Sequence, residues 1–410
     1  MNADQLLYLI LGILTFSFAL ERCLSWLNMR HHQRQLPPSL QGRYDSEKYQ
    51  QSYDYHRANY QFGWIQSVIS TLSTLAILYF GGFGWLDQQL RGLSEHAVYL
   101  PLLFFGVLFV VSDVLSLPFQ LYGTFVIEEK FGFNRTTPRL FFVDKLKSWV
   151  MGILIGGLVM GTLLLLVDAL GENFWIWFWV FISAFMLVMN VFYTSIFLPL
   201  FNKLSPLESG SLRTAIENYS EQVSFPLDNI LVMDGSKRSN KANAFFSGLG
   251  KQKKVVLFDT LIDNHSEDEL VAVLAHEVGH YKKRHIIQSL VLGILQTGLI
   301  LFILSRFIQS PVLSAAMGSP EVGVHLNLLA FGLLFSPIST IIGVFLNIFS
   351  RKNEFEADRF AAETYSPTPL KEALIRLHAD NLSNLTPHPW HVFMNYSHPP
   401  LLKRLEALDS

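Results

Sequence analysis

The chain has 410 residues, of which 50% are apolar and only 16% are charged, whereas an average soluble protein is about 25% charged. This composition excludes an ordinary soluble enzyme and a disordered chain. The net charge of −2 gives no basic excess that would indicate a nucleic-acid partner, and the single cysteine, Cys23, excludes an intramolecular disulfide and a cysteine-based metal site.

Seven apolar stretches are each about as long as the roughly 20 residues that cross a bilayer. The first has no preceding cation and no small-residue cleavage site, so we interpret it as a retained span and not as a signal peptide. The sequence therefore predicts a mainly α-helical, polytopic membrane protein with about seven transmembrane helices. The stretches are Leu6–Leu27, Trp64–Leu86, Tyr99–Leu121, Trp149–Val167, Phe174–Phe201, Ile286–Ile308 and Leu326–Phe349.

Lysine and arginine alternate between the connectors. Connectors 28–63 and 122–148 carry five each, whereas 87–98, 168–173 and 309–325 carry one in total. Because cytoplasmic connectors are enriched in these residues, the pattern predicts an extracytoplasmic N-terminus and a cytoplasmic C-terminus. Four parts follow: spans 1–5 with their cytoplasmic connectors (1–201), a cytoplasmic segment (202–285), spans 6 and 7 (286–349), and a cytoplasmic C-terminal segment (350–410).

One ionisable residue, Asp113, lies within the third apolar stretch. Such a group usually faces a water-filled chamber between helices or pairs with a structural partner. The sequence leaves both alternatives open for Asp113.

The segment 202–285 combines helices and strands. Residues 207–223 are predicted to be helical, and Asn229–Met233 and Lys253–Phe258 to be strands. A further helix is predicted to begin at Ser266, where Glu269 completes a capping box. No proline follows before the sixth span, so the sequence allows this helix to continue into it.

On that helix lies His276-Glu277-Val278-Gly279-His280. Histidines four residues apart share one helical face, so both imidazoles can reach one Zn²⁺ at ~2.0–2.1 Å. Glu277 is displaced around the helix and can act on a water as general base. The pattern is typical of zinc peptidases; the alternative is two surface histidines on an amphipathic helix.

The third zinc ligand is not at the spacing of the metzincins, because Lys283 and Ile286 stand where that class has glycine and histidine. His285 lies five residues after His280, and a continuous helix would point it well away from the histidine pair.

A better candidate follows the last span. Glu354 and Asp358 are four residues apart and share a helical face. Glu354 can complete a His₂Glu site, and Asp358 can accept the second ring N–H of a zinc histidine. Glu356 is about 200° around the helix from Glu354 and is predicted to point elsewhere. The alternative is an acidic, solvated helix face.

Near the C-terminus, Ser397-His398-Pro399-Pro400 predicts a turn before a short helix that contains Arg404. His398 and Arg404 can stabilise an oxyanion or hold a substrate carboxylate. The alternative is a purely structural turn.

Five motifs together resemble one family. They are the connector Gly123–Asn134, the segment Asn243-Ala-Phe-Phe-Ser-Gly248, the His-Glu-x-x-His pattern, Glu354-x-x-x-Asp358 and Ser-His-Pro-Pro-Leu. In this order they resemble the Ste24-type (type 1) CaaX prenyl proteases, which are integral-membrane zinc metalloproteases.

The resemblance implies spans that enclose a chamber, with a gluzincin-like zinc-metalloprotease domain on the cytoplasmic side. It implies removal of the last three residues of prenylated CaaX proteins. One Zn²⁺ would be bound by His276, His280 and Glu354, with Glu277 as the base. Asn243 and Ala244 would pair with extended substrate at an edge strand, and His398 and Arg404 would contact the substrate or transition state.

Two alternatives stay open. The first is a broad quality-control protease for membrane proteins, whose substrates need no prenyl group. The second is a non-catalytic chamber protein with a structural zinc, which the lack of a persuasive fourth protein ligand disfavours. The expected partners are a peptide or protein substrate and membrane lipid, without nucleic acid. Short extracytoplasmic connectors and no evident organelle-retention signal suit a bacterial inner membrane.

Overall fold

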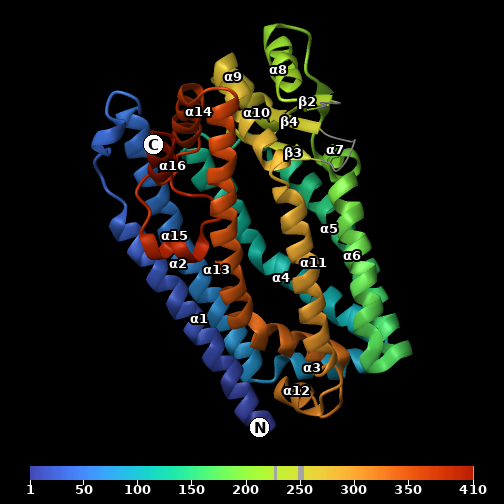
Figure 1. Cartoon of the computed structure of the whole chain (residues 1–410). Coiled ribbons are helices and arrows are strands. Elements are labelled where there is room, and N and C mark those ends of the chain that lie inside the picture. The colour runs from blue at the N-terminus through green and yellow to red at the C-terminus, as the bar shows by residue number, and fades with distance from the viewer. Residues whose placement is uncertain (226–228, 248–253, 410) are drawn as a thin grey trace.

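The computed structural model describes residues 1–225, 229–247 and 254–409. Gly248, which ends the Asn243 motif, and Lys253, which begins a predicted strand, lie outside this part of the chain. Figure 1 shows α1, α2 and α13 along one side and α5 and α6 along the other, with α4 and α11 between them. The N-terminus lies at the end of the helices that is remote from the sheet.

The predicted spans lie in long helices. Six helical segments of the described chain are long and apolar enough to cross a membrane, and the segment 138–201 contains two of the predicted spans, which a turn at Gly171–Asn173 separates. The chain is therefore an integral membrane protein with a mainly helical fold. The spanning helices are α1 (Ala3–His31), α2 (Ser46–Tyr79), α4 (Tyr99–Tyr122), α5 (Pro138–Leu170), α6 (Phe174–Phe192), α11 (His285–Ser305) and α13 (Val324–Thr364).

The second predicted span was wrong at its C-terminal end. Helix α2 ends at Tyr79, and Gly81 then adopts φ = +68°, a conformation that glycine reaches without steric cost. The chain turns into α3 (Gly82–Arg91). A Cβ atom on Gly84 would lie 2.1 Å from the Gly318 carbonyl oxygen, so α3 is packed directly against the connector that follows α12 (Pro311–Ala316).

Asp113 on α4 has a partner within the helices. Its carboxylate lies 2.8 Å from Lys145 Nζ of α5 and accepts a 2.8 Å hydrogen bond from Trp149 Nε1. These contacts match the structural pair, which was one of the two alternatives.

The segment between the fifth and sixth predicted spans contains a four-stranded sheet of order β1-β2-β4-β3. Strands β2 and β4 are parallel, and β3 is antiparallel to β4 with Ala244 opposite Leu257, so β3 lies at the edge. The predicted strand at 229–233 is confirmed, and the second predicted strand is confirmed over its described residues 254–258. The helix predicted over 207–223 is present but begins later, at Ser211. The elements are β1 (Leu204–Pro206), α8 (Ser211–Gln222), β2 (Asn229–Met233), β3 (Ala244–Ser247), β4 (Lys254–Phe258) and α9 (Asp259–Asn264).

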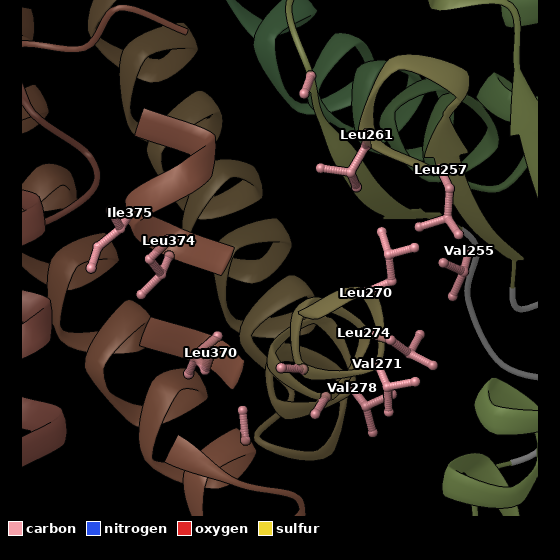
Figure 2. Close-up of a cluster of buried hydrophobic side chains, with 14 of the residues drawn as sticks. Val255, Leu257, Leu261, Leu270, Val271, Leu274, Val278, Leu370, Leu374 and Ile375 are labelled. Carbon is pink, nitrogen blue, oxygen red and sulfur yellow. The ribbon is translucent and has the colours of Figure 1, made fainter. Parts of the chain in front are cut away.

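The core of this part forms around α10 (Glu267–Lys282). Leu270, Val271 and Leu274 point from α10 toward Val255 and Leu257 of β4 (Figure 2), and all five are at most 2% exposed. Full burial of one such side chain contributes about 1.5–3 kcal/mol. This packing fixes α10 against the sheet.

The C-terminal helices are α14 (Pro367–Asp380), α15 (Pro389–Asn395) and α16 (Leu401–Asp409).

Helix α10 begins as predicted and ends earlier than a continuous helix would. The Ser266–Glu269 capping box is present. Lys282 ends the helix, Arg284 adopts a left-handed conformation with φ = +60°, and α11 begins at His285. A non-glycine residue in this region breaks the helix, so α10 and the sixth span are two helices. The shorter turns are η1 (Pro38–Leu40), η2 (Gly123–Glu128), η3 (Gly171–Asn173), η4 (Tyr193–Phe197), α7 (Leu198–Phe201) and η5 (Gly235–Lys237).

Candidate metal centre and active site

Two helices cross closely at the candidate site. A Cβ atom on Gly279 of α10 would lie 3.0 Å from Ala357 Cα and 3.1 Å from Ala357 O of α13. Only glycine permits this approach without displacement of a backbone. The crossing places the histidine pair of α10 beside the acidic residues of α13.

The donor atoms of His276, His280 and Glu354 converge. The two Nε2 atoms are 3.1 Å apart, and Glu354 carboxylate oxygens lie 3.4 Å from His276 Nε2 and 3.3 Å from His280 Nε2. Tetrahedral ligands of a zinc ion at ~2.0–2.1 Å lie about 3.4 Å from one another. Glu354 Oε2 is also buried, and among the described residues it has no hydrogen bond of regular geometry, its contact with His276 Nε2 being the long one at 3.4 Å. The spacing and the unsatisfied oxygen both fit a metal ion bound by these residues.

Asp358 and Arg404 lie behind this cluster. His276 Nδ1 is 2.9 Å from Asp358 Oδ1, so a proton on Nδ1 leaves Nε2 available as a ligand. Arg404 donates from Nε and Nη2 to the two Asp358 oxygens at 2.7 and 2.6 Å. Both residues are buried, at 2% and 6% exposure. Paired hydrogen bonds of this kind fix the carboxylate in one orientation.

The neighbouring charges perturb titration in the cluster. Burial alone lowers the pKa of His276, but hydrogen bonds to Asp358 and Glu354 outweigh it and raise the pKa to about 9. Burial alone raises the pKa of Glu354, but hydrogen bonds from His276 and His280 outweigh it and hold the pKa far below its usual range. Glu354 is therefore an anion that attracts a cation, either a proton on histidine or a metal ion.

The position of Arg404 suits the orientation of Asp358 better than direct contact with a substrate. Its guanidinium is buried against Asp358, and Nη1 lies 3.5 Å from Glu354 Oε2. Direct contact of Arg404 with substrate stays a prediction, and the observed geometry favours a positioning role.

His398 lies at the open side of the cluster. Its Nε2 is 3.3 Å from Glu354 Oε1, while its side chain is 65% exposed. It lines a pocket of about 640 Å³ together with Asn243. Glu277 lines a second pocket of about 460 Å³ with His280. The structure thus brings His398 beside Glu354 and places Glu277 with His280 in a second pocket, each next to accessible space.

Asn243 and Ala244 lie at the start of the edge strand β3. Asn243 is exposed, and its Oδ1 accepts a hydrogen bond from the Ala244 amide at 2.9 Å. An edge strand presents unpaired backbone groups to which an extended peptide can add. The predicted edge position is confirmed, whereas the substrate contacts of both residues stay predictions.

The prediction that His285 points away from the histidine pair was wrong. Its Nδ1 lies 3.0 Å from His280 Nδ1, and its Nε2 lies 3.3 Å from Glu356 Oε2. The helix break at Arg284 redirects the chain, so the angular argument for a continuous helix does not apply. Glu356 points away from the metal cluster, as predicted. His285 is the site residue that sequence reasoning missed. The sequence around Arg284 continues the helical pattern and so gave no signal that the helix breaks there.

The fold and the donor cluster define a class: an integral-membrane metallopeptidase whose candidate metal site lies beside a sheet edge. Two family models match the chain. "CAAX prenyl protease N-terminal, five membrane helices" covers residues 25–203, and "Peptidase family M48" covers residues 206–410. The chain belongs to peptidase family M48.

Relatives with known names agree over nearly the whole chain. The chain is 36% identical to a CAAX prenyl protease 1 homolog of Oryza sativa, over 94% of this chain and 93% of that protein. It is 32% identical to a human CAAX prenyl protease 1 homolog, over 92% and 89%. The crystal structure of S. mikatae Ste24p superposes with a TM-score of 0.93 at 31% identity and covers 99% of both chains.

Proposed function

We propose that the protein is a zinc-dependent endopeptidase that removes the last three residues of prenylated CaaX substrates. One observation carries the proposal. The converging His276, His280 and Glu354 donors lie beside Glu277 and His398, which line two pockets that also include residues of the sheet edge. The names of the relatives support the substrate class.

The proposed mechanism assigns each side chain one task. Zinc, when bound by His276, His280 and Glu354, supplies Lewis acidity at the scissile carbonyl. Glu277 accepts a proton from the attacking water and passes it to the leaving amine. His398 donates from Nε2 to the oxyanion that forms.

The remaining groups position the zinc ligands and the substrate peptide. Asp358 orients His276 and is itself oriented by Arg404. Asn243 and Ala244 pair with the extended peptide at the edge of β3.

We further propose that the catalytic segment faces the cytoplasm and the N-terminus faces the opposite side. The alternating lysine and arginine content of the connectors supports this orientation. The proposed location is a bacterial inner membrane, for which the short extracytoplasmic connectors are the argument. Cysteine labelling of single-cysteine variants from either side of sealed vesicles tests the orientation.

The function is tested with purified, zinc-loaded protein and a farnesylated CaaX peptide beside its unprenylated twin. Faster cleavage of the farnesylated peptide, lost in Glu277→Gln, is the expected result. Equal cleavage of both peptides would move the function to general membrane proteolysis. No cleavage of either by protein that holds zinc would support the non-catalytic chamber.

A further inference from the structure

The start of β3 and the residue before it line two pockets, and the second pocket also includes His280 of the candidate metal site. The first pocket, of about 640 Å³, is lined by Asn243 and His398. The second, of about 460 Å³, is lined by Phe245 and Glu277. Asn243 and Phe245 are two residues apart at the start of the same edge strand. A peptide that extends along β3 therefore passes from one pocket, across the site, into the other.

The second pocket faces the membrane-spanning helices. Asn190 of α6, Leu290 of α11 and Ser350 of α13 line it together with Ile286. A prenyl chain is apolar and belongs among spanning helices, where apolar groups are stable. On the proposed function, the prenylated cysteine would lie at the second pocket, beside its apolar residues Phe245, Ile286 and Leu290, and the residues that follow it would extend into the first.

The first pocket is suited to an anion. Its lining includes the ammonium of Lys241 and the imidazole of His398, and none of the described residues that line it is acidic. Its volume lies within the ~300–1,000 Å³ of pockets that hold small ligands, enough for a short peptide. The last residue of a CaaX substrate ends in an α-carboxylate, so the tripeptide that is released carries a negative charge at its C-terminal end.

Lys241 is the fixed cation of this pocket. Its Nζ lies 3.0 Å from Tyr55 Oη and 2.9 Å from Glu128 Oε2, and it stands 4.4 Å from the Phe133 ring centroid. Burial alone lowers the pKa of Lys241, but hydrogen bonds with Glu128 and Tyr55 outweigh it, so the ammonium stays charged at neutral pH. An ammonium has three N–H donors, and the contacts recorded among the described residues use two.

The backbone beside Lys241 is held rigidly. Ala242 N donates to Asn381 Oδ1 at 3.1 Å, and Asn381 Nδ2 donates to Ala242 O at 3.1 Å. These two bonds tie the segment before β3 to the end of α14. The position of Lys241 relative to the edge strand is thereby set before any substrate binds, which is the preorganisation that selective recognition requires.

We infer that Lys241 binds the α-carboxylate of the substrate's last residue and so sets the cut three residues from the end. This inference rests on the proposed function. Lys241 lies three positions before Ala244, the residue at which the edge strand β3 begins. An extended tripeptide spans about 10 Å, so one charged contact at its end limits where the scissile bond can lie.

The test compares two farnesylated peptides that differ only in a C-terminal acid or amide. The wild-type protein is expected to favour the acid at least tenfold in kcat/KM. In Lys241→Gln this ratio falls close to one through a higher KM for the acid, and Lys241→Arg restores part of it. The exposed Lys237, four residues earlier in the same loop, provides a matched Lys237→Gln control that keeps the full ratio.

Equal cleavage of acid and amide by the wild-type protein would overturn the inference, as would an unchanged ratio in Lys241→Gln. A second measurement separates it from the proposed function. Binding of the free tripeptide as acid or as amide is followed by thermal stabilisation of the purified protein. If no peptide is cleaved, stabilisation by the acid alone, lost in Lys241→Gln, still supports the site; equal stabilisation or none overturns it.

Discussion

The close crossing of α10 and α13 makes Gly279 a sensitive position for metal binding. A Cβ atom there would lie 3.0 Å from Ala357 Cα, 3.1 Å from Ala357 O and 3.2 Å from Phe360 Cβ. Ordinary van der Waals contacts of a Cβ atom begin at about 3.4 Å. Ala357 is fully buried, and its clashing atoms belong to the backbone of a long helix. Relief of the clash in Gly279→Ala therefore requires the helices to separate by a few tenths of an ångström.

Two effects of opposite sign determine how much Gly279→Ala changes the free energy of unfolding. Alanine gains about 1 kcal/mol over glycine in a helix interior, whereas overpacking costs about 1–3 kcal/mol. The net expectation is a loss of stability of up to about 2 kcal/mol. Zinc affinity is expected to fall about tenfold, because Glu354 moves with α13 while the histidines move with α10.

The assay is competition for zinc with a chelator of known affinity, beside denaturant unfolding in detergent. The control is Gly343→Ala on α13, where a Cβ atom would meet no described residue within 4 Å, and this variant is expected to keep wild-type zinc affinity. Unchanged zinc affinity and stability in Gly279→Ala would refute the reasoning that the crossing distance fixes the donor geometry.

Three further predictions follow from the same contacts. Glu354→Ala is expected to lower zinc affinity by about a hundredfold or more, whereas Glu356→Ala retains zinc; metal analysis after dialysis distinguishes them, and the reverse pattern would overturn the ligand assignment. Arg404→Ala removes the cation paired with buried Asp358, whose remaining described partner is His276 Nδ1. The variant is expected to cost about 3–5 kcal/mol of unfolding free energy, measured by denaturant titration; a loss below about 1 kcal/mol would contradict the pairing. Burial lowers the pKa of His378 to about 4, so the imidazole binds a proton more readily in the unfolded state than in the folded state. The free energy of unfolding is therefore expected to fall as the pH drops from about 6.5 to 4. His378→Gln should flatten that pH dependence, and an unchanged pH dependence would show that other groups cause it.

The sequence predicted the spans, the two strands and the metal cluster because each has a local signature. Apolar length marks a span, and the i, i+4 spacing of His276 and His280 follows from helix geometry. The capping box at Ser266 likewise depends on residues three positions apart. These features need no knowledge of the tertiary fold.

Other features depend on contacts between distant segments. The break at Arg284 occurs without glycine or proline, so the position of His285 beside His280 could not be predicted from periodicity. The second span ends early because the chain turns at Gly81, and the helix after the turn packs through Gly84 on the backbone of Gly318. The Arg404–Asp358 pair joins residues 46 positions apart, and no local pattern distinguishes it from an exposed arginine.

The most direct test of the account is the mass of the product that the zinc-loaded protein releases from a farnesylated CaaX peptide. The account predicts the free C-terminal tripeptide and a new carboxylate on the farnesylated cysteine, formed by the wild-type protein and absent with Glu277→Gln. Release of the same tripeptide by Glu277→Gln at the wild-type rate would contradict the assignment of Glu277, and cuts at other positions would contradict the proposed cleavage site.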